Sequence, residues 1–347
     1  MPRISIAFIC LGFTACGGDD DVGGGPADAS AAADATPAAD GYRSVTVGEH
    51  TSCDLTPDGA ACWGRNPFGV LGRGDEEDSP RPVPVAGEHD FRQISAGPIH
   101  VCALDAAGAA WCWGSNSTGQ GGTGSTEGPN LEPEPVTGGL VFVQISAGYD
   151  HTCAVAEGGA AYCWGNNGYG QLGNGVESDL EVEPTPVAGG MSFRQISAAN
   201  SFTCAVTTEG DGTCWGLDSL GQLGDGGEIT GMTTSLSREP VALAGGLSLQ
   251  MVSGGQQSAC AVDQDGGGHC WGRNDVGRLG DDSDVDSSSP VRVVGLHEFE
   301  TITTGGTHAC GLTSDGAAFC WGANTDGQLG VAEPADLSRA PVPVSGG

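Results

Sequence analysis

Cysteine is the residue whose spacing most clearly implies chemistry in this chain of 347 residues. Fourteen cysteines are present, and the twelve that follow Cys16 fall into six pairs whose members lie nine or ten positions apart. Even numbers of regularly spaced cysteines in an exported protein indicate disulfide bonds, whereas zinc sites favour cysteines roughly two to four residues apart. We therefore predict six disulfides, Cys53–Cys62, Cys102–Cys112, Cys153–Cys163, Cys204–Cys214, Cys260–Cys270 and Cys310–Cys320.

A β-hairpin would bring the two members of each pair together, because facing residues of antiparallel strands lie within disulfide reach. In the last pair, a loop of Ser314, Asp315 and Gly316 leaves Cys310 and Cys320 equidistant from the turn. Asp-Gly suits such a turn, since Gly tolerates positive φ. The first pair has one residue fewer between its cysteines, so it requires a β-bulge or a tighter turn at Pro57 and Asp58.

The hairpin belongs to a longer repeat. A Cys-Trp-Gly triplet occurs six times, and its tryptophans are separated by 50, 51, 51, 56 and 50 residues. A period of about 50 residues with short strands is typical of a propeller or solenoid. The tryptophans are Trp63, Trp113, Trp164, Trp215, Trp271 and Trp321.

Within each period, a small-residue strand precedes Gly-x-x-His-x-Cys-Ala-Leu, Asp-Gly, Trp-Gly-x-Asn and Gly-Gln-Leu-Gly, with substitutions between copies. This pattern resembles the regulator-of-chromosome-condensation repeat and covers residues 42–347. The resemblance implies an all-β propeller with four-stranded antiparallel blades. Members of that family usually have seven blades, but this chain shows six units, so we predict a six-bladed propeller. The small-residue strands should lie nearest the axis, where strands crowd one another.

Each unit ends in a Pro-Val segment, and proline belongs at sheet edges or strand starts because it cannot donate to a ladder. No such segment precedes the first small-residue strand, whereas the last one, residues 341–344, has nothing after it. We therefore predict that residues 43–64 supply three strands of one blade and residues 341–344 the fourth. Pairing of the N- and C-terminal strands would then close the ring.

The N-terminus reads as a targeting segment at residues 1–16, with a charged Arg3 and an apolar run over residues 4–13. Phe13-Thr14-Ala15-Cys16 resembles the lipobox of bacterial lipoproteins, although Phe13 stands where Leu is usual. The resemblance implies a lipid on Cys16, and the alternative is an ordinary secretory signal. Residues 17–41 have the composition of a disordered tether, since they contain almost nothing large and apolar to bury.

The chain carries 44 acidic and 12 basic residues, a net charge of −32, which argues against nucleic acid and anionic membrane surfaces as partners. Twenty of the acids and only three of the bases lie in six acidic segments, 73–80, 121–134, 174–184, 225–239, 281–289 and 331–340. Insertions at one point of a repeat commonly form a binding face, but solvated loops that keep the protein soluble are an equal alternative. The candidate partner-binding residues are Asp75, Glu76, Glu77, Asp78, Glu177, Asp179, Asp281, Asp282, Asp284 and Asp286.

The sequence gives weaker evidence for metal-binding or catalytic sites. Residues 281–286 could hold Ca²⁺, but they lack the glycine and the bidentate Glu of an EF-hand, so a solvated turn is favoured. His100, His151 and His308 recur two residues before a cysteine, and hydrogen bonding to a neighbouring turn is favoured over a metal ring. Six of the seven tryptophans follow a cysteine and look structural, and only Trp111 is extra. We find no catalytic constellation, so we predict no enzyme activity, metal or cofactor.

The family that the repeat resembles includes a nucleotide-exchange factor, an ultraviolet photoreceptor and an exported bacterial enzyme inhibitor, so the resemblance does not fix a function. From the leader and the acidic segments we expect a non-enzymatic protein-binding propeller, lipid-anchored outside the cytoplasm on a bacterial envelope. Its partner would be a protein, with basic character favoured. The alternative is an inhibitor of an extracytoplasmic enzyme.

Overall fold

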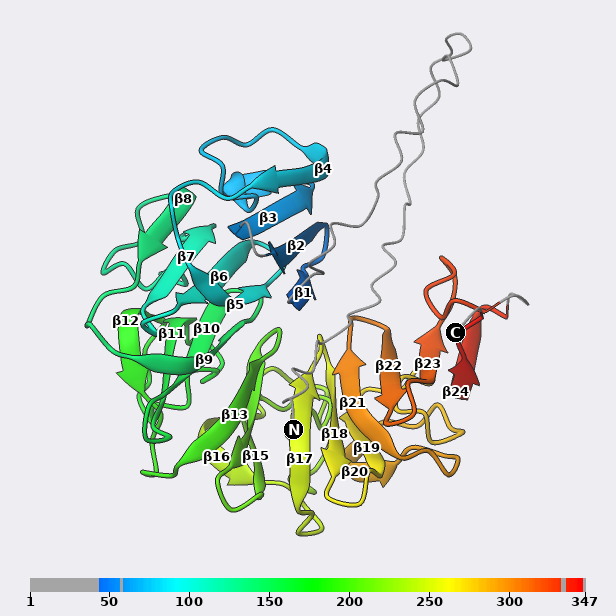
Figure 1. Cartoon of the computed structure of the whole chain (residues 1–347). Helices are drawn as coiled ribbons and strands as arrows, with labels where there is room; N and C mark the ends of the chain where they lie inside the picture. Colours follow the sequence, from blue (N-terminus) through cyan, green and yellow to red (C-terminus); the bar gives the residue numbers. More distant parts are fainter. Residues whose placement is uncertain (1–43, 57–58, 332–334, 346–347) are drawn as a thin grey trace, which may run out of the picture.

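The computed structural model describes residues 44–56, 59–331 and 335–345, which form six antiparallel sheets of four strands each (Figure 1). Each sheet is one blade, and the blades follow one another in chain order. The strands of blades 1 to 3 are β1 (Ser44–Val47), β2 (Thr51–Thr56), β3 (Gly59–Gly64), β4 (Ser79–Pro84); β5 (Phe91–Ala96), β6 (His100–Asp105), β7 (Ala110–Gly114), β8 (Asn130–Pro135); β9 (Phe142–Ala147), β10 (His151–Ala156), β11 (Ala161–Asn166), β12 (Leu180–Pro186).

Blades 4 to 6 repeat this plan. Their strands are β13 (Phe193–Ala198), β14 (Phe202–Thr207), β15 (Gly212–Leu217), β16 (Leu236–Ala242); β17 (Leu249–Gly254), β18 (Ser258–Asp263), β19 (Gly268–Gly272), β20 (Ser287–Arg292); β21 (Phe299–Thr304), β22 (His308–Thr313), β23 (Ala318–Ala323), β24 (Leu337–Pro343). The one helix in the described residues is a single 3₁₀ turn, η1 (Pro67–Gly69). The predicted all-β, six-bladed architecture is confirmed.

The position of each strand in its blade follows from its side chains. The small-residue strands β1, β5, β9, β13, β17 and β21 lie at one edge of their sheets, and consecutive members of this series contact each other. Small residues allow that close approach near the axis. The proline-containing strands β4, β8, β12, β16, β20 and β24 form the other edge, where an absent N–H costs no ladder bond.

The six predicted disulfides are all present, each between directly opposed residues of the second and third strands of a blade. The Cα atoms of the bridged cysteines lie 4.0 to 4.1 Å apart. In blade 1, Thr56 pairs with Gly59 and Cys53 with Cys62 without a register shift. Only two residues therefore separate the strands, which agrees with the tighter turn. Pro57 and Asp58 themselves lie outside the described residues.

The predicted closure of the ring by its terminal strands is wrong. In β24, Val342 pairs with Cys320 of β23 in blade 6, and the first blade takes its fourth strand, β4, from its own repeat, with Val83 opposite Cys62. The physical reason is local: the Pro-Val segment that follows each acidic segment folds back onto the strand just before that segment. Each repeat is therefore a complete blade, and residues 341–344 are not needed by blade 1.

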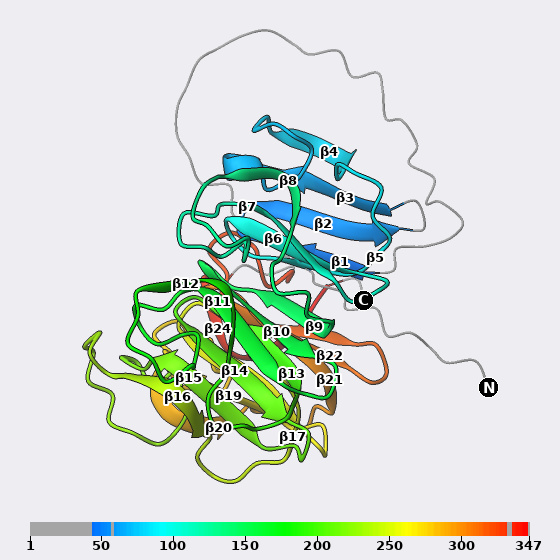
Figure 2. The ribbon, with the colours of Figure 1, turned by 90° about the vertical axis from the view of Figure 1, so that its left-hand side faces the viewer.

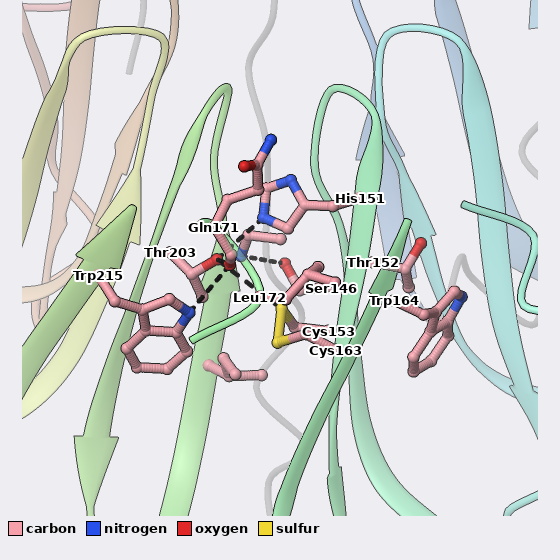
Figure 3. Close-up of a disulfide and its surroundings, with 12 residues drawn as sticks. Ser146, His151, Thr152, Cys153, Cys163, Trp164, Gln171, Leu172, Thr203 and Trp215 are labelled. Atoms are coloured by element: carbon pink, nitrogen blue, oxygen red, sulfur yellow. Dashed lines mark hydrogen bonds between the residues drawn. A yellow bond between two sulfur atoms is a disulfide. The ribbon is translucent and has the colours of Figure 1, made fainter. Parts of the chain in front are cut away.

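Five hydrophobic clusters join consecutive blades from blade 1 to blade 6. In the cluster between blades 3 and 4, the Cys153–Cys163 bridge and Leu172 of blade 3 pack against Phe193 and Trp215 of blade 4. Figure 3 shows the bridge, Leu172 and Trp215. Alternate residues along a strand face opposite sides, so each blade offers its disulfide to the next blade and its tryptophan to the previous one. In Figure 2, blades 1 and 2 overlap in the upper part of the view and the later blades lie below them.

The tryptophan of the Cys-Trp-Gly triplet is the centre of each blade-to-blade contact. Its indole Nε1–H donates to a backbone carbonyl of the previous blade; for Trp215 the acceptor is Gln171, at 2.9 Å. The indole also lies against the last glycine of the Gly-Gln-Leu-Gly turn. A Cβ on Gly173 would come within 2.6 Å of the Trp215 indole nitrogen, and Gly173 has a φ of +65°. Both observations explain why this turn ends in glycine.

Two predicted regions, the leader ending at Cys16 and the tether at residues 17–41, lie outside the described residues. Within the part of the chain that is described, no helix is long and apolar enough to cross a membrane.

Candidate partner-binding face

The acidic segments occupy the same place in every blade. Each forms the loop between the third and fourth strands, and its last residues begin the fourth strand. In an antiparallel sheet this loop lies on the same side as the turn between the first two strands, and opposite the disulfide hairpin turn. We name the side of the disc with these loops the acidic face. Because the third and fourth strands are the outer ones, the loops lie toward its rim.

In blade 1, most of the predicted carboxylates have structural partners. The Asp75 carboxylate accepts from Arg73 Nε at 2.8 Å and from the Glu77 amide at 2.9 Å. The Asp78 carboxylate accepts from the Asn66 amide at 2.7 Å. Arg73 also reaches Glu77, at 3.5 Å. Hydrogen bonds from the amide and the guanidinium hold the pKa of Asp75 below its ordinary value. Glu76 is exposed and is not part of this network.

Blade 5 shows the same division. The Asp281 carboxylate accepts from Asn274 Nδ2 at 3.0 Å, and that of Asp286 accepts from the Asn274 amide at 2.6 Å. Asp284 pairs with Arg339 of blade 6 at 2.8 Å. Asp282 is exposed with a φ of +65°, a region that favours glycine, and its amide bonds to the Arg339 carbonyl. The carboxylates of Asp281 and Asp286 accept hydrogen bonds from Asn274 and so hold the loop in shape. This agrees with the interpretation of residues 281–286 as a solvated turn.

In blade 3, Glu177 reaches Arg238 of blade 4 at 3.4 Å, and Asp179 is exposed while its carbonyl accepts from the Asn167 amide. The three arginines of the acidic segments, Arg73, Arg238 and Arg339, are thus all paired with carboxylates of those segments. The predicted residues stay in their own loops on blades 1, 3 and 5. The acidic face therefore presents separated acidic loops around its rim.

An asparagine after the Trp-Gly pair fastens the loop in five of the six blades. Asn116, for example, accepts from the Gly121 amide through Oδ1 and donates through Nδ2 to the carbonyls of Ser125 and Glu127. The series is Asn66, Asn116, Asn167, Asn274 and Asn324. We name this arrangement the asparagine clamp.

Blade 4 has Asp218 at the clamp position, which our sequence reading missed. Its carboxylate accepts from the Leu223 amide at 3.0 Å, but an ionised carboxylate has no proton to donate to the loop. Burial, opposed by that hydrogen bond and assisted by the charge of Asp225, raises the pKa of Asp218 to about 6. Aligning the six repeats position by position would have revealed the exchange.

The recurring histidines have structural partners. His100 Nε2 lies 2.8 Å from Thr152 Oγ1, and His151 Nε2 lies 2.9 Å from Thr203 Oγ1, both across a blade boundary. Each threonine hydroxyl donates its only proton to a carbonyl of the previous blade, so the histidine must be the donor through Nε2–H. Burial lowers the pKa of His100 to about 3. These two residues form hydrogen bonds as predicted, but each partner is a hydroxyl on a strand of the next blade, where a neighbouring turn was predicted.

The blades and their repeated contacts define a class, the propellers assembled from repeats of about 50 residues. Residues 15–346 match the family model described as "RCC1-like domain", and the chain belongs to that family. The resemblance drawn from the repeat motif is therefore confirmed.

Two relatives illustrate the similarity of sequence. The chain is 31% identical to the ultraviolet-B receptor UVR8 of Arabidopsis thaliana over 282 residues, which cover 79% of this chain and 63% of the receptor. It is 30% identical to the probable E3 ubiquitin-protein ligase HERC6 of Homo sapiens over 251 residues, 71% of this chain but 24% of the ligase. The chain thus spans less than two thirds of either relative.

Two solved structures share the fold. Human WBSCR16 superposes with a TM-score of 0.78 at 22% identity, covering 89% of this chain and 82% of that one. Prp20p of Saccharomyces cerevisiae, described with its binding to Gsp1p and histones, gives a TM-score of 0.76 at 23% identity, covering 88% and 77%. At these identities the likeness concerns the fold alone.

Proposed function

We propose that this protein is a non-enzymatic binding module that is tethered to the bacterial cell envelope through a lipid on Cys16. Its acidic face would recognise a basic region of a partner protein. The observation that carries the proposal is the charge balance of the six acidic segments, 20 acids against 3 bases. All three bases are already paired within those segments, so uncompensated negative charge remains for a partner.

Two further observations support an extracytoplasmic protein partner. Six disulfides fit an oxidising compartment, where such bonds persist. A propeller presents variable loops on a rigid scaffold, a common arrangement for recognition, and Prp20p, which shares the fold, is described with protein partners. Charge complementarity mainly speeds association and makes it sensitive to salt.

The experiment is capture of partners from an envelope extract, using a variant of the acidic face. Glu76→Gln, Asp179→Asn and Asp282→Asn remove three exposed charges that hold no loop together through their carboxylates. We expect this variant to lose most of the salt-sensitive capture that the wild type shows. The matched control is Glu157→Gln, Glu209→Gln and Glu298→Gln, three exposed residues on the opposite side of the disc.

Equal capture by the two variants, or capture that salt does not weaken, would contradict recognition by the acidic face. An activity assay on the captured partner then separates simple binding from enzyme inhibition. The anchor is tested independently: Cys16→Ala should move the protein from the membrane fraction to the soluble fraction. A mature wild-type protein whose measured intact mass lacks lipid would contradict the anchor but leave the binding proposal standing.

A further inference from the structure

In the described residues, the ring of blades shows an opening between blade 6 and blade 1. Each of the five other boundaries has a buried cluster and an indole hydrogen bond, but the described residues of blades 6 and 1 share neither. Figure 1 shows β1–β4 and β21–β24 on the two sides of this opening. We name it the seam. Its two faces are the side of blade 6 that carries Cys310–Cys320 and the side of blade 1 that carries Trp63.

The face of blade 6 lacks the cover that other blades have. At Gly277 of blade 5, an added Cβ would meet Arg339 of blade 6 within 2.8 Å, whereas at the equivalent Gly327 it would meet nothing within 4 Å. At Gly280 it would strike the Trp321 indole at 2.8 Å, whereas at the equivalent Gly330 the nearest atom belongs to Val344 of the same blade. Blade 6 thus keeps the glycine turn that elsewhere receives an indole.

The face of blade 1 supplies an indole without an acceptor. The five tryptophans at closed boundaries are at most 1% exposed, and each donates to a carbonyl of the previous blade. Trp63 is only half-buried, and its indole has no hydrogen bond within the described residues. By its position in the repeat, its acceptor would be the carbonyl of Gln328 in blade 6.

Two closed boundaries show a four-residue network that identifies which faces belong together. Between blades 3 and 4, His151 Nε2–H donates to Thr203 Oγ1 at 2.9 Å, and the Thr203 hydroxyl donates to the Gln171 carbonyl at 2.8 Å. The Trp215 indole donates to the same carbonyl (Figure 3). His100, Thr152, Gln120 and Trp164 repeat this network between blades 2 and 3.

The histidine and the hydroxyl occur together or not at all. At each of the other three closed boundaries, the first position is not a histidine and the second position, in the next blade, has no hydroxyl. The residues at these two positions are Thr51 and Val101, Phe202 and Ala259, and Ser258 and Ala309. At the seam the two positions are His308 in blade 6 and Ser52 in blade 1, so the hydroxyl is again present with the histidine. A buried histidine N–H without an acceptor is costly, which is the physical reason for the pairing.

We propose that blade 6 packs on blade 1 of the same chain and closes the ring through His308, Ser52, Gln328 and Trp63. In this sixth boundary, His308 Nε2–H donates to the Ser52 hydroxyl, and Ser52 and the Trp63 indole both donate to the Gln328 carbonyl. Closure is thus made by packing blade faces, without exchange of strands. The same faces could also join two copies, but that contact is head-to-tail and generates open chains unless it closes, so we assign the contact to one chain.

One residue sets this boundary apart from the others. Asp54 occupies the position that holds Ala103, Ala154, Ala205, Ala261 and Gly311 in the later blades. Its neighbours Cys53 and Leu55 face blade 2, so the Asp54 side chain faces the seam. It is 2% exposed, and its Oδ1 has no hydrogen-bond partner within the described residues. The Ala61 amide donates to the Asp54 carboxyl, so one of its two oxygens stays without a partner. A buried carboxyl that is only partly satisfied opposes packing, which makes the seam the boundary that opens most readily.

The experiment is a double-mutant cycle on the full-length mature protein, with unfolding followed by denaturant titration. We expect His308→Ala and Ser52→Ala to be coupled by roughly fivefold in the unfolding equilibrium. His151→Ala with Thr203→Ala is the matched positive control, and His308→Ala with Thr203→Ala, whose residues lie on different boundaries, is the additive control. Additivity of the His308 and Ser52 substitutions, with coupling retained in the positive control, would overturn the proposal.

A second measurement reports the exposure of Trp63 in the folded protein. Acrylamide quenching of tryptophan fluorescence is compared between the wild type and Trp63→Phe, in parallel with sedimentation across protein concentrations. If the ring is closed in one chain, Trp63 is shielded, so its removal leaves the intensity of the quenchable fluorescence unchanged in the monomer. A quenchable Trp63 in the monomer, or shielding that is present only in a dimer or larger assembly, would contradict closure within one chain.

Discussion

The boundary between blades 3 and 4 and the acidic segment beside it use polar groups in opposite ways. At the boundary, His151, Gln171, Thr203 and Trp215 are buried and linked by hydrogen bonds. In the acidic segment, Glu177 is 88% exposed in its pair with Arg238. Buried, satisfied networks are expensive to break, whereas exposed ion pairs contribute little. Stability therefore resides between the blades, and the loops can change their charge at low cost.

The largest effect should come from the centre of a boundary. Trp215→Ala removes a fully buried indole and its bond to Gln171, and we expect a loss of about 3–5 kcal/mol of unfolding free energy. Thermal unfolding by circular dichroism measures it. Trp111→Ala is a suitable comparison, because that indole is only partly buried. Similar losses for the two variants would show that burial between blades is not what matters.

Removal of one disulfide should come next. Cys153→Ala with Cys163→Ala opens a loop of about ten residues, for which the chain-entropy model gives roughly 2–3 kcal/mol. The blade should retain its strands, because the hairpin register does not depend on the bridge alone. Denaturant titration of the variant under non-reducing conditions gives the loss. Stability equal to the wild type would mean that packing alone holds the hairpin.

Asp218 gives a smaller and pH-dependent effect. Its pKa is raised to about 6 in the folded protein from an ordinary value of 3.8, so its contribution is favourable below the ordinary value and is lost as the pH rises through about 6. Asp218→Asn restores the asparagine clamp and should stabilise by about 1 kcal/mol near pH 8.

Below about pH 4 the gain from Asp218→Asn should vanish, since the carboxyl is then protonated in both states. Melting temperatures of the two proteins across this range provide the measurement. A gain of the same size at every pH would show that the titration of Asp218 plays no part in it.

The smallest effect is expected at the rim. The variant with Glu76→Gln, Asp179→Asn and Asp282→Asn should unfold within about 0.5 kcal/mol of the wild type, as is usual for exposed sites. The same melting assay applies. A loss of unfolding free energy as large as that expected for Trp215→Ala would show that the loop charges contribute as much to stability as the blade boundaries do.

The sequence predicts the blade well because the information is local. The spacing of Cys310 and Cys320 about one turn is enough to place both strands of the hairpin and its bridge. The small-residue and proline-containing strands likewise reveal their own positions. The prediction that the terminal strands pair was wrong because it concerns strands far apart in the chain. Nothing in Val342 itself distinguishes pairing with Cys320 from pairing with Cys62.

The candidate site was predictable only as a set of loops. Composition identifies the acidic segments, but it cannot separate Asp286, whose carboxylate holds the Asn274 amide, from the exposed Asp282. That separation depends on loop geometry and on arginines from the next blade, such as Arg339. The buried Asp54 and Asp218 stand out only when equivalent positions of the repeats are compared.

Each of the six disulfides in the described residues joins two strands of one blade. Duplication or loss of a repeat of about 50 residues would therefore add or remove a blade together with its own bridge. No cysteine elsewhere would be orphaned, and oxidative folding would need no new pairing. The number of blades in such a chain can thus change over evolution as a whole-unit event, independently of the redox machinery that matures it.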